Sequence, residues 1–134
     1  MREIKFRGKD TNGDWHYGLL AIVKTNQMKI VKSGYYISND LGHAYAYQVR
    51  PETVGQYIER KDNNGKEIYA GDILMSGKSI ALVEYSDDID QDFYWGNAIG
   101  FVFNFDPDKM DKNGYEIISN IYENEDLLNE DWYL

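Results

Sequence analysis

Apolar and polar residues alternate with a period of two along most of this chain, and this pattern limits the folds open to it. Residues 4–7 and 44–49 are two of these stretches. Such alternation is typical of half-buried β-strands, whereas no window of about 12 residues carries a helical stripe. The chain has 134 residues, a length that suits one core or two small lobes sharing one. We therefore expect a mostly β domain with no helix longer than about ten residues.

Local motifs refine this expectation. Residues 19–23 are continuously apolar, which predicts a buried strand. The tetrapeptide Asp-x-Asn-Gly occurs at residues 10–13, 62–65 and 111–114. Because Asn-Gly suits both central positions of a type I′ turn, each copy predicts a β-hairpin tip. None of the three has the ligand spacing of an EF-hand calcium loop.

Several classes of chemistry are excluded by composition. The chain has no cysteine, so it has no disulfides, thiolate zinc sites or cysteine nucleophiles. Its two histidines, His16 and His43, are too few for a site built from three imidazoles. We find neither a glycine-rich phosphate loop nor a Gly-x-Ser-x-Gly elbow. We expect a protein that is not an enzyme and needs no cofactor or metal, with His16 on the exposed side of a strand.

Charge is divided unevenly between the two halves. Residues 1–66 hold 11 Lys and Arg against 7 Asp and Glu, a balance of +4, and residues 67–134 hold 3 against 16, a balance of −13. Such asymmetry indicates either an electrostatic partner or head-to-tail self-association. An acidic, solvated surface without a partner is the simpler alternative.

The strongest candidate for a binding surface lies in the acidic half. Four carboxylates fall within residues 86–92, directly before three aromatic residues. Acidic groups speed the encounter with a basic partner, and aromatic anchors supply binding energy. The candidate partner-binding residues are Asp88, Asp90, Asp92, Phe93, Tyr94 and Trp95. The alternatives are a solvated loop tip, a bound divalent cation, and rings that fill the core.

The expected partner is therefore a protein, either one with a basic surface or a second copy of the chain. A nucleic-acid-associated factor is the alternative function, because the N-terminal half is basic and aromatic. The overall charge of −9 argues against it. A metal-dependent enzyme using the acidic loop is a weaker alternative. No apolar run approaches a membrane span and the N-terminus lacks a signal peptide's apolar stretch, so we expect a cytoplasmic protein.

Residues 51–75 (PETVGQYIERKDNNGKEIYAGDILM) closely resemble the YopX family, and residues 1–8 and 116–128 resemble its start and end. The resemblance implies an accessory protein of phages and prophages of Gram-positive bacteria, acting in the host cytoplasm without an assigned activity. It also implies an SH3-like barrel. On this basis we predict a barrel lobe at about 59–134, with an N-terminal lobe of β-hairpins and short helical turns at about 1–58.

The motif residues themselves suit structural roles. Gly55 and Gly71 permit close backbone approach or an unusual φ. Asp72 lies just before an apolar pair and is expected to accept backbone hydrogen bonds at a strand start.

Overall fold

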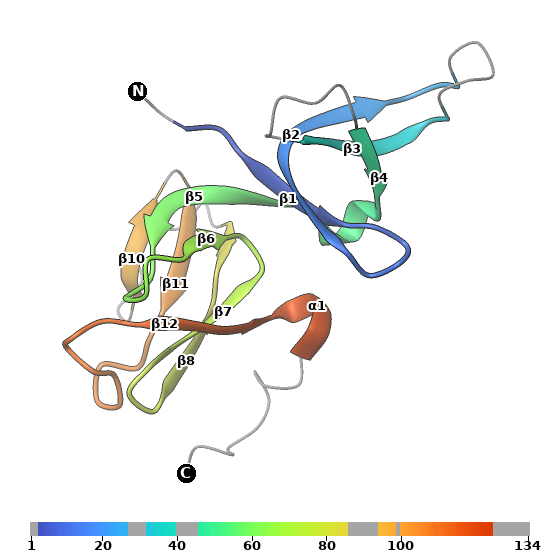
Figure 1. Ribbon diagram of the computed structural model, residues 1–134. Coiled ribbons are helices and arrows are strands. Elements are labelled where there is room, and N and C mark those ends of the chain that lie inside the picture. The colour runs from blue at the N-terminus through green and yellow to red at the C-terminus, as the bar shows by residue number, and fades with distance from the viewer. Residues whose placement is uncertain (1–2, 27–31, 40–45, 86–93, 99, 125–134) are drawn as a thin grey trace. The chain divides into compact units, whose positions relative to one another are not determined.

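A computed structural model describes residues 3–26, 32–39, 46–85, 94–98 and 100–124. The chain divides into two compact units, Met1–Tyr57 and Ile58–Leu134 (Figure 1). The predicted boundary lay between residues 58 and 59. Whether the two units behave as one domain stays a prediction.

The described part of the chain is built from short antiparallel strands, so the predicted mostly β class is confirmed. The strands are β1 (Phe6–Lys9), β2 (Trp15–Val23), β3 (Gly34–Asn39), β4 (Ala46–Val49), β5 (Gly55–Lys61), β6 (Glu67–Tyr69), β7 (Asp72–Ser76), β8 (Ser79–Leu82), β9 (Glu84–Tyr85), β10 (Tyr94–Ala98), β11 (Phe101–Asn104) and β12 (Glu116–Asn120). Helical structure in the described residues is limited to a 3-10 turn, η1 (Pro51–Thr53), and one α-helical turn, α1 (Ile121–Asn124).

In the N-terminal unit the strands are arranged in the order β4-β3-β2-β1-β5. The sheet curls enough for the end of β4 to reach the end of β1, where the Arg50 N–H donates to the Lys9 carbonyl at 2.8 Å. Ile37 and Val49 are buried. A Cβ on Gly8 would lie 2.7 Å from a Val49 methyl, so a glycine is needed where these two strands pack.

The C-terminal unit contains two three-stranded sheets, β10-β11-β9 and β12-β7-β8. The last residues of β5 enter this unit beside β6. The buried side chains of its core come from five strands and two connections between strands, and they are Ile58, Ile68, Leu74, Ala81, Val83, Phe103 and Phe105. Phe103 and Phe105 lie edge to face at 6.1 Å between ring centroids. The ladders of the described strands do not close into a barrel, so the SH3-like barrel stays a prediction.

The Asp-x-Asn-Gly turns form as expected in position but not in type. Glu59 is the one non-glycine residue with positive φ among those described, whereas a type I′ turn requires positive φ at both central residues. Instead, the Gly13 N–H donates to the Asp10 carbonyl and Gly13 itself has a φ of +91°. This is the pattern of a type I turn followed by a glycine in the left-handed region.

The third copy is not a hairpin tip, which corrects the prediction. It repeats the local geometry, with the Asn113 N–H donating to Asp111 Oδ1 at 2.9 Å. Its flanking strands, β11 and β12, however, belong to different sheets. Local hydrogen bonding fixes the turn, but strand pairing depends on residues far away in the sequence.

Candidate protein-binding surface

The β2–β3 arm is the part of the N-terminal unit where β2 extends beyond β1 (Figure 1). Pairing of β1 with β2 ends at Phe6 and Gly18. From Leu19 to Val23, β2 pairs with Gly34–Ser38 of β3. We use the name arm for these two paired segments.

The arm exposes apolar side chains on both of its faces. Leu19 is 59% exposed and Ile22 is 50% exposed. Because residues an odd number of positions apart on a strand point to opposite faces, these two side chains lie on different sides of the sheet. Tyr17 precedes Leu19 on the same face and is also exposed. Exposed apolar side chains that are contiguous, rather than scattered, mark interaction sites.

One edge of the arm is open. Among the described strands, none pairs with the edge of Leu19–Val23 that faces away from β3. An open edge offers backbone N–H and C=O groups to another strand. The arm therefore combines the two properties that β-strand addition by a partner requires, which are unpaired backbone groups and apolar side chains beside them.

The prediction that residues 19–23 form a buried strand is wrong in its burial. The strand is present, but Leu19, Ala21 and Ile22 are exposed. The cause is that an apolar run is buried only where other parts of the chain cover it, and the pairing of β1 with β2 reaches only as far as Gly18 of β2. The sequence signal for this surface was therefore present but was assigned to the core.

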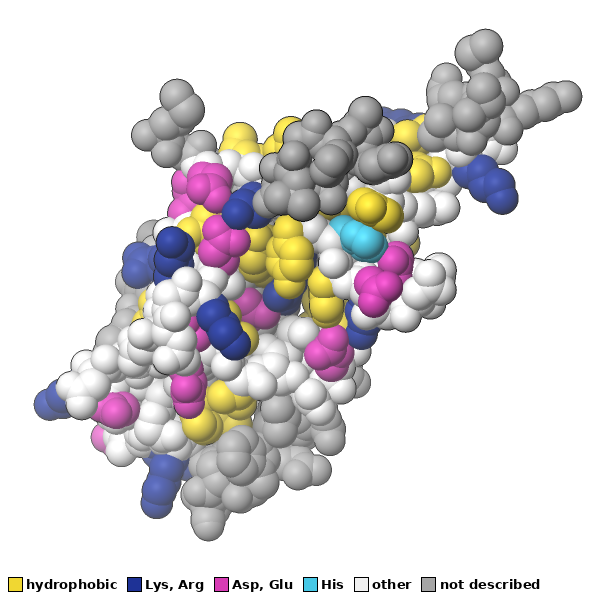
Figure 2. All heavy atoms as spheres, in the orientation of Figure 1, with side chains coloured by type: hydrophobic (Ala, Val, Ile, Leu, Met, Phe, Trp, Pro, Cys, Tyr) yellow, Lys and Arg dark blue, Asp and Glu magenta, His cyan; other side chains and the backbone are white. Residues whose placement is uncertain are grey.

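Lysines lie between the two strands of the arm in the sequence, and the stretch that contains the arm has no acidic residue. Residues 15–38 include Lys24, Lys29 and Lys32 and no Asp or Glu. Lys24 and Lys32 are exposed. Figure 2 shows basic and hydrophobic side chains next to one another at this end of the N-terminal unit. The surface therefore suits a partner that is both acidic and apolar.

The site predicted from the sequence stays a prediction. Asp88, Asp90, Asp92 and Phe93 lie outside the described residues, and so does His43. Tyr94 and Trp95 begin strand β10.

The described residues next to the predicted site have its chemical character. Glu84 and Tyr85 form β9, which is the edge strand of its sheet. Both are exposed, and the Tyr85 ring lies 5.7 Å from the Phe101 ring in an edge-to-face contact.

His16 is half-buried rather than on an exposed face, which corrects the prediction. Its Nε2 lies 2.8 Å from Asp10 Oδ2, and its ring stacks on Tyr47 at 4.0 Å. The hydrogen bond with His16, followed by those from backbone amides, holds the pKa of Asp10 below its ordinary value. The other oxygen of Asp10 accepts the N–H groups of Asn12 and Asp14. Both oxygens are therefore used in holding the turn, and we assign the pair a structural role.

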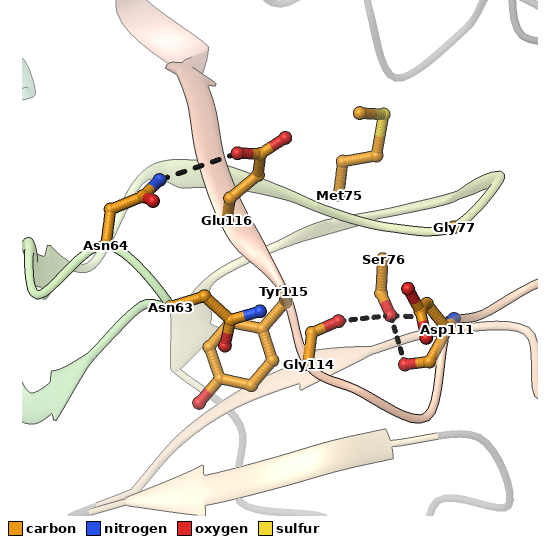
Figure 3. A pocket seen from close by; sticks show the side chains of 9 residues that line it. All are labelled: Asn63, Asn64, Met75, Ser76, Gly77, Asp111, Gly114, Tyr115 and Glu116. Atoms are coloured by element: carbon orange, nitrogen blue, oxygen red, sulfur yellow. Dashed lines mark hydrogen bonds between the residues drawn. The ribbon is translucent and has the colours of Figure 1, made fainter.

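A small polar pocket of about 260 Å³ lies in the C-terminal unit (Figure 3). Hydrogen bonds connect its walls. The Ser76 hydroxyl accepts the Asp111 N–H at 3.0 Å and lies 2.6 Å from the Gly114 carbonyl. The Asn64 amide lies 3.5 Å from Glu116. These contacts anchor the third turn to β7, so the pocket is explained by the packing of a loop.

Other classes of site find no support in the described ranges. There, no three His, Asp or Glu side chains lie close enough together to hold a metal ion. No helix in the same ranges is long and apolar enough to cross a membrane.

The fold and the motif at residues 51–75 define a class of small proteins built from curled antiparallel sheets. The model of the YopX protein family matches residues 5–129, and the chain belongs to that family. Among solved structures it is similar to protein EF1440 from Enterococcus faecalis, with a TM-score of 0.53 at 20% identity, covering 96% of this chain and 99% of that one. At this identity the likeness shows the fold alone. No curated protein matches.

Within the family motif, the described residues have structural roles. Asp72 is buried, and its Oδ2 accepts the Tyr69 N–H at 2.8 Å, as predicted for a carboxylate at a strand start. Gly71 has a φ of +95° and lies against the Tyr122 ring. The motif therefore specifies how β6, β7 and α1 meet.

Proposed function

We propose that this chain is a phage-encoded accessory protein that acts in the host cytoplasm by binding protein, another or itself, without catalysis. The observation that carries the proposal is the exposed apolar surface of the β2–β3 arm, centred on Leu19 and Ile22. Each of these side chains buries apolar area when covered, at about 25 cal/mol for each Å². A partner that covers both faces of the arm gains binding free energy from the burial of both side chains.

The acidic–aromatic segment, Asp88 to Trp95, is the second surface in this proposal. The charge balance of −13 in residues 67–134 supports a role in attracting a basic partner. Replacing Asp88, Asp90 and Asp92 by asparagine is expected to slow association with that partner and to flatten its salt dependence. Trp95→Ala is expected to speed dissociation. A melting curve of Trp95→Ala shows whether the ring instead fills the core.

Nucleic-acid binding has less support from the geometry. Trp15 pairs with Lys9 at the end of the basic strand β1. Its ring is already covered by cations of the same unit. The Arg7 guanidinium carbon lies 4.7 Å from the ring centroid and the Lys9 Nζ lies 5.7 Å from it. Arg7 is also buried, so this side chain is not offered to a phosphate backbone.

Affinity capture from phage-infected cells tests the proposal. The bait is the full chain, compared with the variant that combines Leu19→Ser and Ile22→Ser. Ile4→Ser is the matched control, because Ile4 is 56% exposed and lies outside the arm. We expect the wild type and the control to capture the same protein, or untagged copies of this chain, and the arm variant to lose it. Equal capture by all three proteins would exclude the arm as the binding surface.

A further inference from the structure

We propose that the open edge of the β2–β3 arm docks on the acidic C-terminal half of a second copy of this chain. This inference rests on the proposed function and names the partner of its surface. The arm supplies an edge at Leu19–Val23 with which no other described strand pairs, two apolar faces and, where its strands end, exposed Lys24 and Lys32. The acceptor supplies negative charge and an exposed ring.

Charge complementarity selects this occupant. The arm region, residues 15–38, carries three lysines and no carboxylate, whereas residues 67–134 carry a balance of −13. Opposite charges on the two surfaces raise the association rate and fix their relative orientation. Every second copy carries the acidic surface that complements the lysines, so the arm needs no other protein as its partner.

The described part of the acceptor has an edge of its own. Glu84 and Tyr85 form the edge strand β9 of the sheet β10-β11-β9. Tyr85 is 63% exposed, which gives an apolar ring beside a carboxylate. Two edges that expose apolar side chains and carry opposite charge are suited to pair by strand addition.

Arm-to-arm pairing is the competing arrangement, and electrostatics disfavour it. Two arms side by side would bring the lysines of both copies together, and like charges placed opposite one another are destabilising. The two arrangements respond to salt in opposite directions. Screening weakens the contact between an arm and an acidic surface but strengthens the contact between two arms.

Sedimentation equilibrium of the purified full-length protein over a range of concentration and salt is the test. We expect the wild type to associate at low salt and to dissociate on going from about 50 mM to about 500 mM salt, where the Debye length falls from about 14 Å to about 4 Å. The combined Leu19→Ser and Ile22→Ser variant should be monomeric, and so should the combined Lys24→Glu and Lys32→Glu variant. Ile4→Ser should associate like the wild type. Circular dichroism and melting curves that match the wild type show that each variant is folded.

Each other outcome overturns the inference in a way that separates it from the proposed function. A wild type that stays monomeric, while its arm still captures a different protein, refutes the second copy and leaves the proposed function standing. If both arm variants associate as strongly as the wild type, the arm is not the contact surface, although the chain does self-associate. Association that strengthens with salt refutes docking on the acidic half and favours arm-to-arm pairing. A monomer that captures nothing refutes both.

Discussion

Asp62 connects the turn between β5 and β6 to β12 through one carboxylate. Its Oδ1 accepts the N–H groups of Asn64 and Lys66, each at 2.9 Å, and its Oδ2 accepts that of Ile117 at 2.9 Å. Burial raises the pKa of Asp62, but the three backbone hydrogen bonds and the charge of Lys66 lower it by more, so the pKa lies below its ordinary value. Hydrogen bonds to the charged form are the physical cause.

The first prediction follows from the sign of that shift. A depressed folded-state pKa means that Asp62 stabilises the fold above its unfolded-state pKa of about 3.9, and that this stabilisation is lost as pH falls through the folded-state pKa. Asp62→Asn should lower the free energy of unfolding at neutral pH by about 2 kcal/mol, because its NH₂ group opposes a backbone donor. Urea unfolding at pH 7 and at low pH measures both effects.

Asp111→Asn is the matched control for Asp62→Asn, since Asp111 begins the same tetrapeptide but is exposed. We expect it to cost about 0.5 kcal/mol or less. Equal costs at the two positions would contradict the bridging role of Asp62.

The second prediction concerns Gly71. An alanine there would hold φ at +95° and place Cβ 2.8 Å from the Tyr122 ring. Gly65 has a φ of +79°, and a Cβ there would meet no atom within 4 Å, so it isolates the backbone effect. We expect Gly65→Ala to cost about 1 kcal/mol and Gly71→Ala about 2–3 kcal/mol in thermal or urea unfolding. Equal losses of stability in the two variants would show that the Tyr122 ring moves aside without lowering the free energy of unfolding.

At the scale of the elements, Thr53 joins η1 to the end of β1. Its buried hydroxyl accepts the Lys9 N–H at 2.8 Å and donates to the Arg50 carbonyl at 2.7 Å. Together with the bond from the Arg50 N–H to the Lys9 carbonyl, this contact fixes the curl of the N-terminal sheet.

The third prediction tests this connection. Thr53→Val should cost about 2 kcal/mol, because it leaves the Lys9 N–H without its acceptor. Hydrogen exchange at the Lys9 amide should be faster in the variant. Thr53→Ser keeps the hydroxyl and should restore slow exchange. An unchanged exchange rate in Thr53→Val would show that the hydroxyl does not hold this corner of the sheet.

Sequence reasoning predicted the elements whose cause is local. The short helical turns predicted for the N-terminal lobe include the 3-10 turn at Pro51–Thr53, which has proline at its first position. The turn type at Asp10–Gly13 was wrong because Asn-Gly suits two hairpin geometries, and the Asp10 side chain selects between them.

The non-local features escaped the same reasoning. The burial of Leu19–Val23 depends on how far β1 pairs along β2, which no pattern within residues 19–23 encodes. Likewise, nothing within residues 111–114 shows that β11 and β12 pair with different strands.

At the scale of the whole molecule, the two halves of the chain have different tasks in the proposed function. The N-terminal half presents a basic, apolar strand edge, and the C-terminal half carries the acidic charge. The fourth prediction is that the combined Leu19→Ser and Ile22→Ser variant unfolds within about 0.5 kcal/mol of the wild type, because exposed side chains contribute little to folding. A large loss of stability in urea unfolding would mean that the arm belongs to the core.

The most direct measurement is amide hydrogen exchange along β2 at low and at high protein concentration. If the arm edge takes a strand from a second copy, the outward-facing amides within Leu19–Val23 exchange quickly in the dilute protein and become protected as the protein associates. The amides of Ile73 and Leu74, buried in the C-terminal unit, serve as the internal reference and keep the same protection throughout. Protection of Leu19–Val23 that rises with concentration is the predicted result. Exchange in this segment that is independent of concentration, in a protein that sediments as an oligomer, would contradict strand addition at the arm.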